Sequence, residues 1–460
     1  SKINERYEII DILLHNKLYE DIRLNLKRVN DYEKSLRKLS LDMLTTNEFY
    51  SDYICYEFLK KTIQIVKDNT ELSEKYSYYK NYFDSFDEYH NFLIKTFNFS
   101  NFSSYIGSSN VEKSLFNKDI YSDIDELTIK IETIQENYKY ICQQLTKIID
   151  PKAKSDLVKL EFSEKHNWFL HCTRNRSKTI NNYLNTKKKI SIKDNSGNKL
   201  FVFTKDNLSF KTKDNSNVIL DNTDISNLCN DFIKFNKELN SLNTKYWKIT
   251  MKGIYDKYNE CLKNINTFIG DIDCHTNNAF ISIKDNYFKP EISDEFNSKS
   301  YFRAESIRHP ISEEVNKDKA YIENDIDLGV PEKDGILLYG MNSGGKSTLS
   351  KAVALSVIMA QCGSYVPCKS FVYYPYSQIF TRILSNDKLW SGLSSFQVEV
   401  LEMKHILNHA NQNSLVIGDE VFNSSEFESA ISLVNGCVQK LHQLKCSFVF
   451  CTHLHELMTL

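Results

Sequence analysis

Residues 340–348 read GMNSGGKST, and no other stretch of this chain limits its fold so strongly. They match the pattern G-x-x-x-x-G-K-[ST], in which a glycine-rich loop surrounds a phosphate. The apolar run at 335–339 is typical of a buried strand, and residues 349–361 favour a helix that ends at Gly363. A strand, a loop and a helix in this order direct backbone N–H groups and a positive helix end at a phosphate, so we predict a nucleotide-binding site.

The side chains of this loop suit a nucleotide triphosphate. Lys346 is long enough to reach the β- and γ-phosphate oxygens, and the Ser347 hydroxyl can ligate Mg²⁺. We therefore expect ATP or ADP with Mg²⁺ as cofactors. The predicted nucleotide-contacting residues of the loop are Gly340, Met341, Asn342, Ser343, Gly344, Gly345, Lys346, Ser347 and Thr348.

Two further apolar runs end in polar residues. Residues 414–418 precede Asp419 and Glu420, and residues 446–451 precede Thr452 and His453. A carboxylate at a strand end beside the phosphate loop can hold Mg²⁺, and a second carboxylate can orient the attacking water. A histidine at the third strand end can hydrogen-bond the γ-phosphate. The predicted catalytic residues are Lys346, Glu420 and His453, and the predicted magnesium ligands are Ser347 and Asp419.

Composition narrows the remaining classes. The 460 residues suffice for two to four domains, and a net charge of −2 indicates no global attraction to nucleic acid. Eleven cysteines without a C-x-x-C pair support neither a zinc site nor a redox motif, and they favour a reducing, intracellular compartment. No apolar run reaches the roughly 20 residues that span a bilayer, so we expect no membrane association. The chain's ends suggest a piece of a longer protein.

Glycine and proline divide the chain into regions. Residues 1–289 contain one proline and residues 290–460 contain five, which predicts long helices first and short strands and helices later. We place the main boundary near residues 276–300. The predicted domains are a helical core with a first arm (1–154), a β-rich insert (155–222), a second arm returning to the core (223–285) and a P-loop ATPase domain (286–460).

Two segments repeat apolar residues at spacings of three and four, which predicts a pair of long antiparallel helical arms. We expect the second arm to run for about 45 residues, or roughly 65 Å. Ordinary helices of a bundle are the alternative. The predicted seam residues are Ile124, Leu127, Ile131, Ile134, Tyr138, Ile141, Leu145 and Ile148 in the first arm, and Ile225, Leu228, Phe232, Phe235, Leu239, Leu242, Tyr246 and Ile249 in the second.

The insert between the arms differs from them in the period of its apolar residues and in its charge. Its predicted short strands are residues 157–162, 169–173, 190–192, 200–204, 208–211 and 217–220. Residues 174–213 contain eleven Lys or Arg and two Asp. Such runs are usually solvated surface, but at the end of two arms this one could neutralise the phosphates of double-stranded DNA. The predicted DNA-binding residues are Arg174, Arg176, Lys187, Lys188 and Lys189.

The C-terminal motifs, taken together, resemble the ATPase of the MutS family of DNA mismatch-repair proteins. The matching stretches are RHP (308–310), YIENDIDL (321–328), GMNSGGKST (340–348), GSYVP (363–367), IFTRI (379–383), SGLSSFQVE (391–399), the pair Asp419-Glu420 and THLHEL (452–457). RYEIIDILLHN (6–16), FIGDIDC (268–274) and NYFKPEI (286–292) resemble the family's core and levers. The resemblance implies a multidomain fold with a mostly α-helical core and lever arms, a small β-rich clamp insert and an α/β P-loop ATPase of the ABC type.

The same resemblance implies a dimer with composite ATP sites, formed with an identical or a different MutS-type subunit. Tyr321 matches the aromatic residue that stacks on adenine, and Ser394 and Ser395 match the loop that contacts the partner's nucleotide. ATP would convert a DNA-bound state into a sliding clamp. A downstream repair factor or nuclease is an expected partner, and the expected location is a compartment with DNA: nucleus, nucleoid, organelle or viral replication site.

One stretch departs from the family pattern. The family usually has D-E-x-G-R-G-T-S, whereas residues 419–429 read DEVFNSSEFES, and Ser343 stands where methionine is common. The altered loop motivates one alternative to mismatch binding, a nucleotide-gated DNA scaffold with little hydrolysis. Two others remain: a MutS-like protein that binds branched recombination intermediates, and a chromosome-maintenance ATPase. The last predicts much longer arms and leaves SGLSSFQVE and THLHEL unexplained.

Overall fold

The computed structural model of the chain describes residues 2–105, 113–163, 167–316, 318, 320–341, 344–383, 395–422 and 426–459. The chain is mostly helical and forms two compact units. Unit 1 comprises residues 1–27, 61–78 and 268–460, and unit 2 comprises residues 28–60 and 79–267. Two helices contribute to both units, α4 (Thr46–Asp68) and α9 (Thr223–Lys284). The four predicted domains stay a prediction.

The central element of unit 1 is a four-stranded parallel sheet. Its strands, in spatial order, are β10 (Gly335–Tyr339), β14 (Ser447–Thr452), β13 (Ser414–Asp419) and β12 (Gln378–Arg382). The predicted strands at 335–339, 414–418 and 446–451 are confirmed. Because the strands are parallel, their carboxyl ends meet at one edge of the sheet, which is where open α/β sheets bind ligands.

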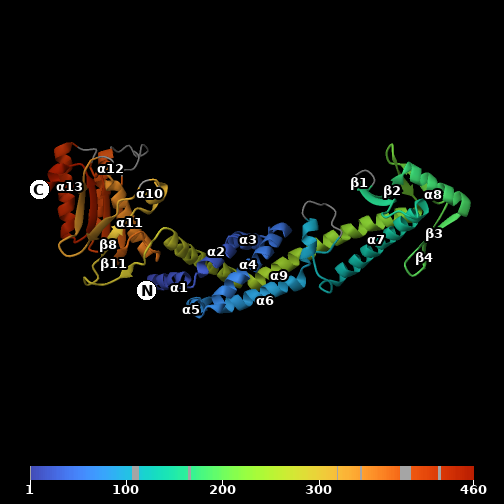
Figure 1. Cartoon of the computed structure of the whole chain (residues 1–460), viewed down its shortest axis with the longest axis horizontal. Helices are drawn as coiled ribbons and strands as arrows, with labels where there is room; N and C mark the ends of the chain where they lie inside the picture. Colours follow the sequence, from blue (N-terminus) through green and yellow to red (C-terminus); the bar gives the residue numbers. More distant parts are fainter. Residues whose placement is uncertain are drawn as a thin grey trace. The chain divides into compact units, whose positions relative to one another are not determined.

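A second, mixed sheet completes the layers of unit 1. Its order is β7 (Glu291–Ile292), β11 (Ser370–Tyr374), β8 (Tyr301–Ile307) and β9 (Asn324–Leu328). Helix α11 (Lys346–Gln361) packs in one core with residues of both sheets, while α12 (Ser395–His409) and α13 (Phe427–Gln443) share a second core with the parallel sheet (Figure 1). Neighbouring residues of β13 therefore serve opposite faces: Leu415 and Ile417 join the α11 core, and Val416 joins the other.

The other helices of unit 1 are shorter: α1 (Lys2–His15), α2 (Leu18–Leu26), α5 (Thr70–Lys75), α10 (Pro310–Val315) and the 3₁₀ turn His455–Thr459. Helix α1 holds the C-terminal end of α11. The Tyr7 hydroxyl donates to the Ala360 carbonyl at 2.5 Å, and the Arg6 guanidinium donates to the Cys362 carbonyl at 2.7 Å. The Ala360 carbonyl also accepts the Gly363 N–H at 2.9 Å, so the Tyr7 bond adds to the helix's own capping bond, and α1 fixes the end of the helix that starts at the glycine loop.

A buried histidine in unit 1 makes stability depend on pH. His275 of α9 lies within hydrogen-bond distance of the Tyr76 hydroxyl (Nδ1 to Oη 2.8 Å), and burial lowers the pKa of His275 to about 4. The unfolded chain, with a histidine pKa near 6.5, binds more protons between these values, so stability falls as the pH drops from 6.5 to 4. We expect a loss of about 3 kcal/mol over this window from this residue.

Urea unfolding at several pH values measures that loss. In His275→Asn, which keeps an acceptor near Nδ1, the decrease should be smaller by about the same amount, whereas the exposed His15→Asn variant should follow the unmutated protein. If the free energy of unfolding fell equally with pH in His275→Asn and in the unmutated protein, the loss would not come from His275.

Unit 2 is built around two long antiparallel helices, α7 (Ser122–Ile149) and α9 (Figure 1). Tyr138 of α7 donates to Cys229 Sγ near the start of α9 at 3.2 Å, and Tyr246, further along α9, donates to Asp123 near the start of α7 at 2.7 Å. The predicted pairing of two arms is confirmed. Unit 2 also contains α3 (Tyr32–Ser40), α6 (Lys80–Thr96) and the 3₁₀ turn Phe99–Tyr105, and the 3₁₀ turn Ser77–Tyr79 lies at the boundary of the two units.

The second arm differs from its prediction in length and in seam. Helix α9 has 62 residues rather than about 45. The predicted seam residue Ile249 is 54% exposed, whereas Asn243 is buried, accepts a bond from the Leu115 backbone N–H at 3.3 Å and donates to the Lys113 carbonyl at 3.4 Å. An apolar repeat could not indicate this position, because a buried asparagine is stabilised only by partners distant in sequence.

The insert contains all six predicted strands. The antiparallel sheet has the order β1 (Lys159–Ser163), β2 (Asn167–Thr173), β6 (Asn217–Asp221) and β5 (Ser209–Thr212), and β3 (Lys189–Lys193) pairs with β4 (Lys199–Thr204). Helix α8 (Arg174–Lys187) was not predicted. Its buried residues are Ser177, Ile180 and Leu184, and two apolar side chains on one face are too weak a periodic signal in a basic stretch.

Among the described residues, every helix is too short or too polar to pass through a lipid bilayer.

Candidate nucleotide-binding site

The glycine loop joins β10 to α11 at the carboxyl edge of the parallel sheet. Gly345 is the residue before α11 and has a φ of 87°, a left-handed conformation that glycine adopts without a steric cost. The Gly344 N–H donates to the Met341 carbonyl at 3.2 Å, which closes a turn in the loop. The first N–H groups of a helix have no partner inside it, so the start of α11 can donate to phosphate oxygens.

Lys346, the first residue of α11, folds back over the loop. Its ammonium group donates to the carbonyls of Gly340 at 2.8 Å and Met341 at 3.1 Å. These bonds hold a positive charge above the loop, where a di- or triphosphate would need it. The phosphate contact predicted for Lys346 stays a prediction.

Ser347 and Asp419 form the candidate magnesium site. The Ser347 hydroxyl donates to Asp419 Oδ1 at 2.8 Å, although the two residues are 72 positions apart. A hydroxyl and a carboxylate are oxygen ligands of the kind that Mg²⁺ takes, with phosphate and water oxygens completing its octahedron. No group of three or more His, Cys, Asp or Glu forms a metal cluster within the described parts of the chain, and Mg²⁺ bound through phosphates does not need one.

Glu420 and His453 lie next to this pair. His453 Nε2 is 3.0 Å from Glu420 Oε1, and both side chains are partly exposed. Glu420 has a φ of 51°, which is uncommon for a residue other than glycine, and its N–H donates to the Cys451 carbonyl at 2.9 Å. Strained residues of this kind cluster at functional sites, because the surrounding structure has to hold them in place.

Strand pairing explains why these residues meet. In the parallel register, Asp419 pairs with Cys451, and Tyr339 pairs with Thr452, so the loop, the acidic pair and His453 leave adjacent strands at one level. Cys451 is fully buried, and burial raises its pKa to about 11. Its thiol therefore stays neutral, and the charged groups of the site are Lys346, Asp419 and Glu420.

Tyr321 lines a separate pocket in the segment before β9. Its neighbours around that pocket include Arg308, Glu313 and residues 284–287. Tyr321 is half-buried, and burial raises the pKa of its hydroxyl, which interacts with the backbone of His309. The predicted stacking of Tyr321 on adenine stays a prediction.

Comparison with known proteins agrees with this geometry. The family model for MutS domain V matches residues 336–460, which include the glycine loop, Asp419, Glu420 and His453. Curated MutS proteins match the whole length of the chain.

The chain is therefore similar to MutS proteins, and residues 336–460 in particular match MutS domain V.

Three relatives show the extent of the likeness. A protein of Acanthamoeba polyphaga mimivirus described as a mutS homologue is 27% identical over the entire chain, which covers 44% of that relative. The DNA mismatch repair protein MutS of Clostridium kluyveri is 29% identical over the entire chain and 49% of its own length. The mitochondrial mutS homologue of Sarcophyton glaucum is 35% identical over 46% of the chain and 21% of its own length. The chain thus spans about half, or less, of these relatives.

Some predicted MutS site residues lie outside the described residues: Asn342, Ser343, Ser394 and the side chain of Ser395. The predicted DNA contacts lie in unit 2. Lys187, Lys188 and Lys189 are exposed and consecutive where α8 meets β3. Arg174 and Arg176 instead donate to the carbonyls of Asp214 and Leu157, both at 3.1 Å, so these arginines also stabilise the insert itself.

The loop after Glu420 departs from the MutS pattern in a specific way. Phe422 stands at the first glycine position of D-E-x-G-R-G-T-S, yet its φ is 64°. Holding a phenylalanine in this conformation costs on the order of 1–2 kcal/mol. Burial offsets that cost, since Phe422 is 2% exposed and joins the core of α12 and α13. Its ring centroid lies 6.5 Å from that of Phe396.

An ion pair at the same sheet edge was missed in the sequence. Arg382 ends β12, and its Nη2 lies 3.0 Å from Glu399 of α12, with both side chains buried. Its Nε lies 3.2 Å from Glu402, close enough for an ion pair but without hydrogen-bond geometry. The MutS-like stretches at 379–383 and 391–399 contain Arg382 and Glu399, but nothing in the sequence indicates that the two side chains pair.

Arg382→Met should lower the free energy of unfolding by about 3 kcal/mol, because it leaves the buried Glu399 carboxylate without its main partner. The double variant Arg382→Met/Glu399→Met should recover most of that loss, since apolar pairs of similar size often replace buried ion pairs at little cost. Urea denaturation measures both. Arg303→Gln, which breaks an exposed ion pair with Glu295, is the control and should cost less than about 1 kcal/mol. A single variant as stable as this control would contradict the prediction.

Proposed function

We propose that this chain is the ATP-driven DNA clamp of a MutS-type protein that acts in mismatch repair. The observation that carries the proposal is the meeting of Ser347 with Asp419 and of Glu420 with His453 at the sheet edge where the glycine loop begins α11. A P-loop ATPase of the ABC type needs these groups in this arrangement. The names of the relatives, which are DNA mismatch repair proteins, point to the pathway.

In the proposed reaction, the protein binds, orients and stabilises charge. The loop amides and Lys346 hold the phosphates of ATP, while Ser347 and Asp419 hold Mg²⁺, which would neutralise charge on the β- and γ-phosphates. Glu420 orients the attacking water and accepts its proton. His453 is proposed to hydrogen-bond the γ-phosphate, and its contact with Glu420, at 3.0 Å, supports a role beside the proposed general base.

DNA is proposed to bind at the exposed lysines of the insert, through its phosphates and without reading bases. Helix α9 begins just after β6 of the insert and continues without a break to Lys284 in unit 1. The proposed assembly is a dimer of MutS-type subunits with composite ATP sites, in which Ser394 and Ser395 contact the partner's nucleotide. A downstream repair factor or nuclease is a proposed further partner, and the proposed location is any compartment in which DNA is repaired.

A panel of DNA substrates tests the proposal. The affinity of the chain for mismatched duplex, matched duplex and four-way junction is measured with and without ATP. ATP-dependent preference for the mismatch supports the proposal, and preference for the junction supports the recombination alternative. Failure to bind ATP, or equal DNA binding with and without it, would refute both.

A further inference from the structure

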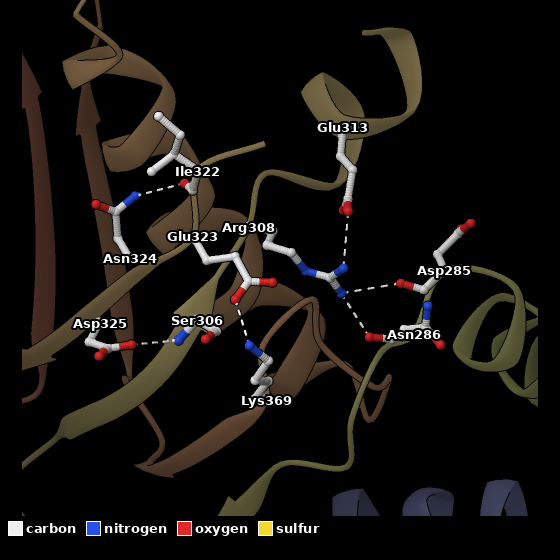
Figure 2. A network of polar contacts seen from close by, with 10 residues as sticks. All are labelled: Asp285, Asn286, Ser306, Arg308, Glu313, Ile322, Glu323, Asn324, Asp325 and Lys369. Atoms are coloured by element: carbon white, nitrogen blue, oxygen red, sulfur yellow. Dashed lines mark hydrogen bonds and ion pairs between the residues drawn. The ribbon is translucent and has the colours of Figure 1, made fainter. Parts of the chain in front are cut away.

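Arg308 makes the densest set of polar contacts at the end of strand β8. One nitrogen of its guanidinium, Nη1, lies 3.0 Å from Glu313 Oε1 in α10. The other, Nη2, donates to the backbone carbonyls of Asp285 at 3.2 Å and Asn286 at 2.7 Å (Figure 2). The side chain is mostly buried, with 13% of its surface exposed. One arginine therefore joins α10 to the residues just after α9.

These two carbonyls belong to the C-terminal end of α9. The helix ends at Lys284, Asn286 has a φ of 53°, and the Tyr287 N–H returns to the Ser282 carbonyl at 3.0 Å. This is the left-handed cap with which helices commonly end. A helix end carries partial negative charge, so a cation there is stabilised, and Arg308 is that cation.

Arg308 is also adjacent to the segment that holds Tyr321. His309, the next residue, caps α10 by accepting the Ser312 N–H on its Nδ1 at 3.2 Å, and the Tyr321 hydroxyl interacts with the His309 backbone. Arg308 and Tyr321 line the same pocket as the residues that follow α9. Arg308 thus contacts the end of α9, and its neighbour His309 contacts Tyr321.

The far side of the Tyr321 segment is anchored separately. Glu323 pairs with Lys369 at 2.7 Å, and the Ser306 N–H donates to Asp325 Oδ1 at 2.8 Å (Figure 2). The residues that follow Tyr321 are therefore fixed to β8 and to Lys369, which precedes β11. The Arg308 guanidinium holds the Glu313 carboxylate and the α9 carbonyls at the same time, so one side chain fixes α10 to the end of α9.

We propose that Arg308 is a positioning residue that couples the C-terminal end of α9 to the Tyr321 segment. Nucleotide held against Tyr321 and DNA held at the other end of α9 then alter each other's affinity through Arg308. The inference rests on the proposed function, because it assumes nucleotide near Tyr321 and DNA at the lysines of the insert. By thermodynamic linkage, the effect of DNA on nucleotide affinity equals the effect of nucleotide on DNA affinity.

Titration of a non-hydrolysable ATP analogue, with and without a short DNA duplex, tests the coupling in the whole chain. In the unmutated protein the dissociation constants should differ by about fivefold or more. In Arg308→Gln the two constants should become nearly equal, while the constant without DNA stays within about twofold of the unmutated value. Arg308→Lys, which keeps the charge but loses the planar fork, should retain part of the ratio. Arg303→Gln, on the same strand but paired with Glu295, should retain all of it.

Amide hydrogen exchange measures whether nucleotide binding affects the end of α9. It also distinguishes a positioning role of Arg308 from a purely structural one. Analogue binding should slow exchange at residues 282–287 in the unmutated protein and leave it unchanged in Arg308→Gln, whereas loss of fold would speed exchange throughout unit 1. Should Arg308→Gln not fold, Arg308→Lys takes its place, with a reduced ratio of dissociation constants and a smaller slowing of exchange at residues 282–287 as the expected result, and an unchanged ratio as the result that overturns the inference.

The outcomes distinguish this inference from the function on which it rests. Nucleotide and DNA binding whose coupling survives Arg308→Gln overturns the inference alone. Binding of both ligands without coupling in the unmutated protein overturns the inference and the clamp mechanism, but not the ATP site. Absence of nucleotide binding overturns the proposed function and the inference together.

Discussion

Glu420→Gln lowers the rate of ATP hydrolysis by about 10²- to 10⁴-fold, which is the usual contribution of a general base. The substitution removes the charge and the proton acceptor but keeps the size of the side chain and a hydrogen-bonding group 3.0 Å from His453. Nucleotide affinity should change little, because Lys346, Ser347 and Asp419 are untouched. Single-turnover hydrolysis and analogue binding, measured on the same preparation, report the two effects separately.

The matched control is Glu428→Gln, which removes an exposed carboxylate from the first turn of α13, eight positions further along the chain. It should retain the unmutated rate. If the unmutated chain binds ATP but does not hydrolyse it, a nucleotide-gated scaffold explains its function better than an ATPase. The buried Phe422, which stands in place of glycine, would then be the structural reason for the missing hydrolysis. Equal turnover in Glu420→Gln and Glu428→Gln would remove Glu420 from the proposed reaction.

Changing Lys187, Lys188 and Lys189 together to Ala weakens DNA binding and reduces its salt dependence by about three slope units, if each lysine contacts one phosphate. A fourfold rise in salt concentration would then lower the DNA affinity of the unmutated protein by about 40-fold more than that of the variant. The loss should be similar for mismatched and matched duplexes, because phosphate contacts carry no sequence information. Fluorescence anisotropy across a salt series measures the slope.

The control removes the same charge elsewhere. Lys404, Lys440 and Lys445 are exposed in unit 1, and Lys445 has a φ of 52°, so its change to Ala matches that of Lys188, whose φ is 61°. This triple control variant should leave the salt dependence of DNA affinity nearly unchanged. Equal slopes for the insert variant and the unmutated protein would place the DNA site elsewhere on the chain.

Local patterns were sufficient for much of the secondary structure. Strands β10, β13 and β14, helix α7 and the six strands of the insert all lie close to their predicted positions, because each has a clear apolar period bounded by turn residues. Helix α8 has two buried apolar residues in fourteen, and its period was too weak to detect. The length of α9 was underestimated because its last turns carry buried polar residues, His275, Thr276 and Ser282, which interrupt the apolar repeat.

The candidate site was predictable for a related reason. Residues at the ends of parallel strands meet at one edge whatever their separation in sequence, so the spacing of strand ends indicated that Lys346, Asp419, Glu420 and His453 belong together. Tyr321 and the partner-contacting serines came from resemblance alone, and they remain predictions.

The sequence by itself determined the elements that depend on neighbours within a few positions: the glycine loop, the strands that end in polar residues, the paired arms and the charge of the insert. Only the tertiary structure decided which distant side chains become partners, including Arg382 with Glu399, Tyr7 with Ala360 and Arg308 with the end of α9. The physical reason is that a buried polar group is stabilised only by a specific partner, and nothing within a few residues of it specifies which segment the fold will bring there.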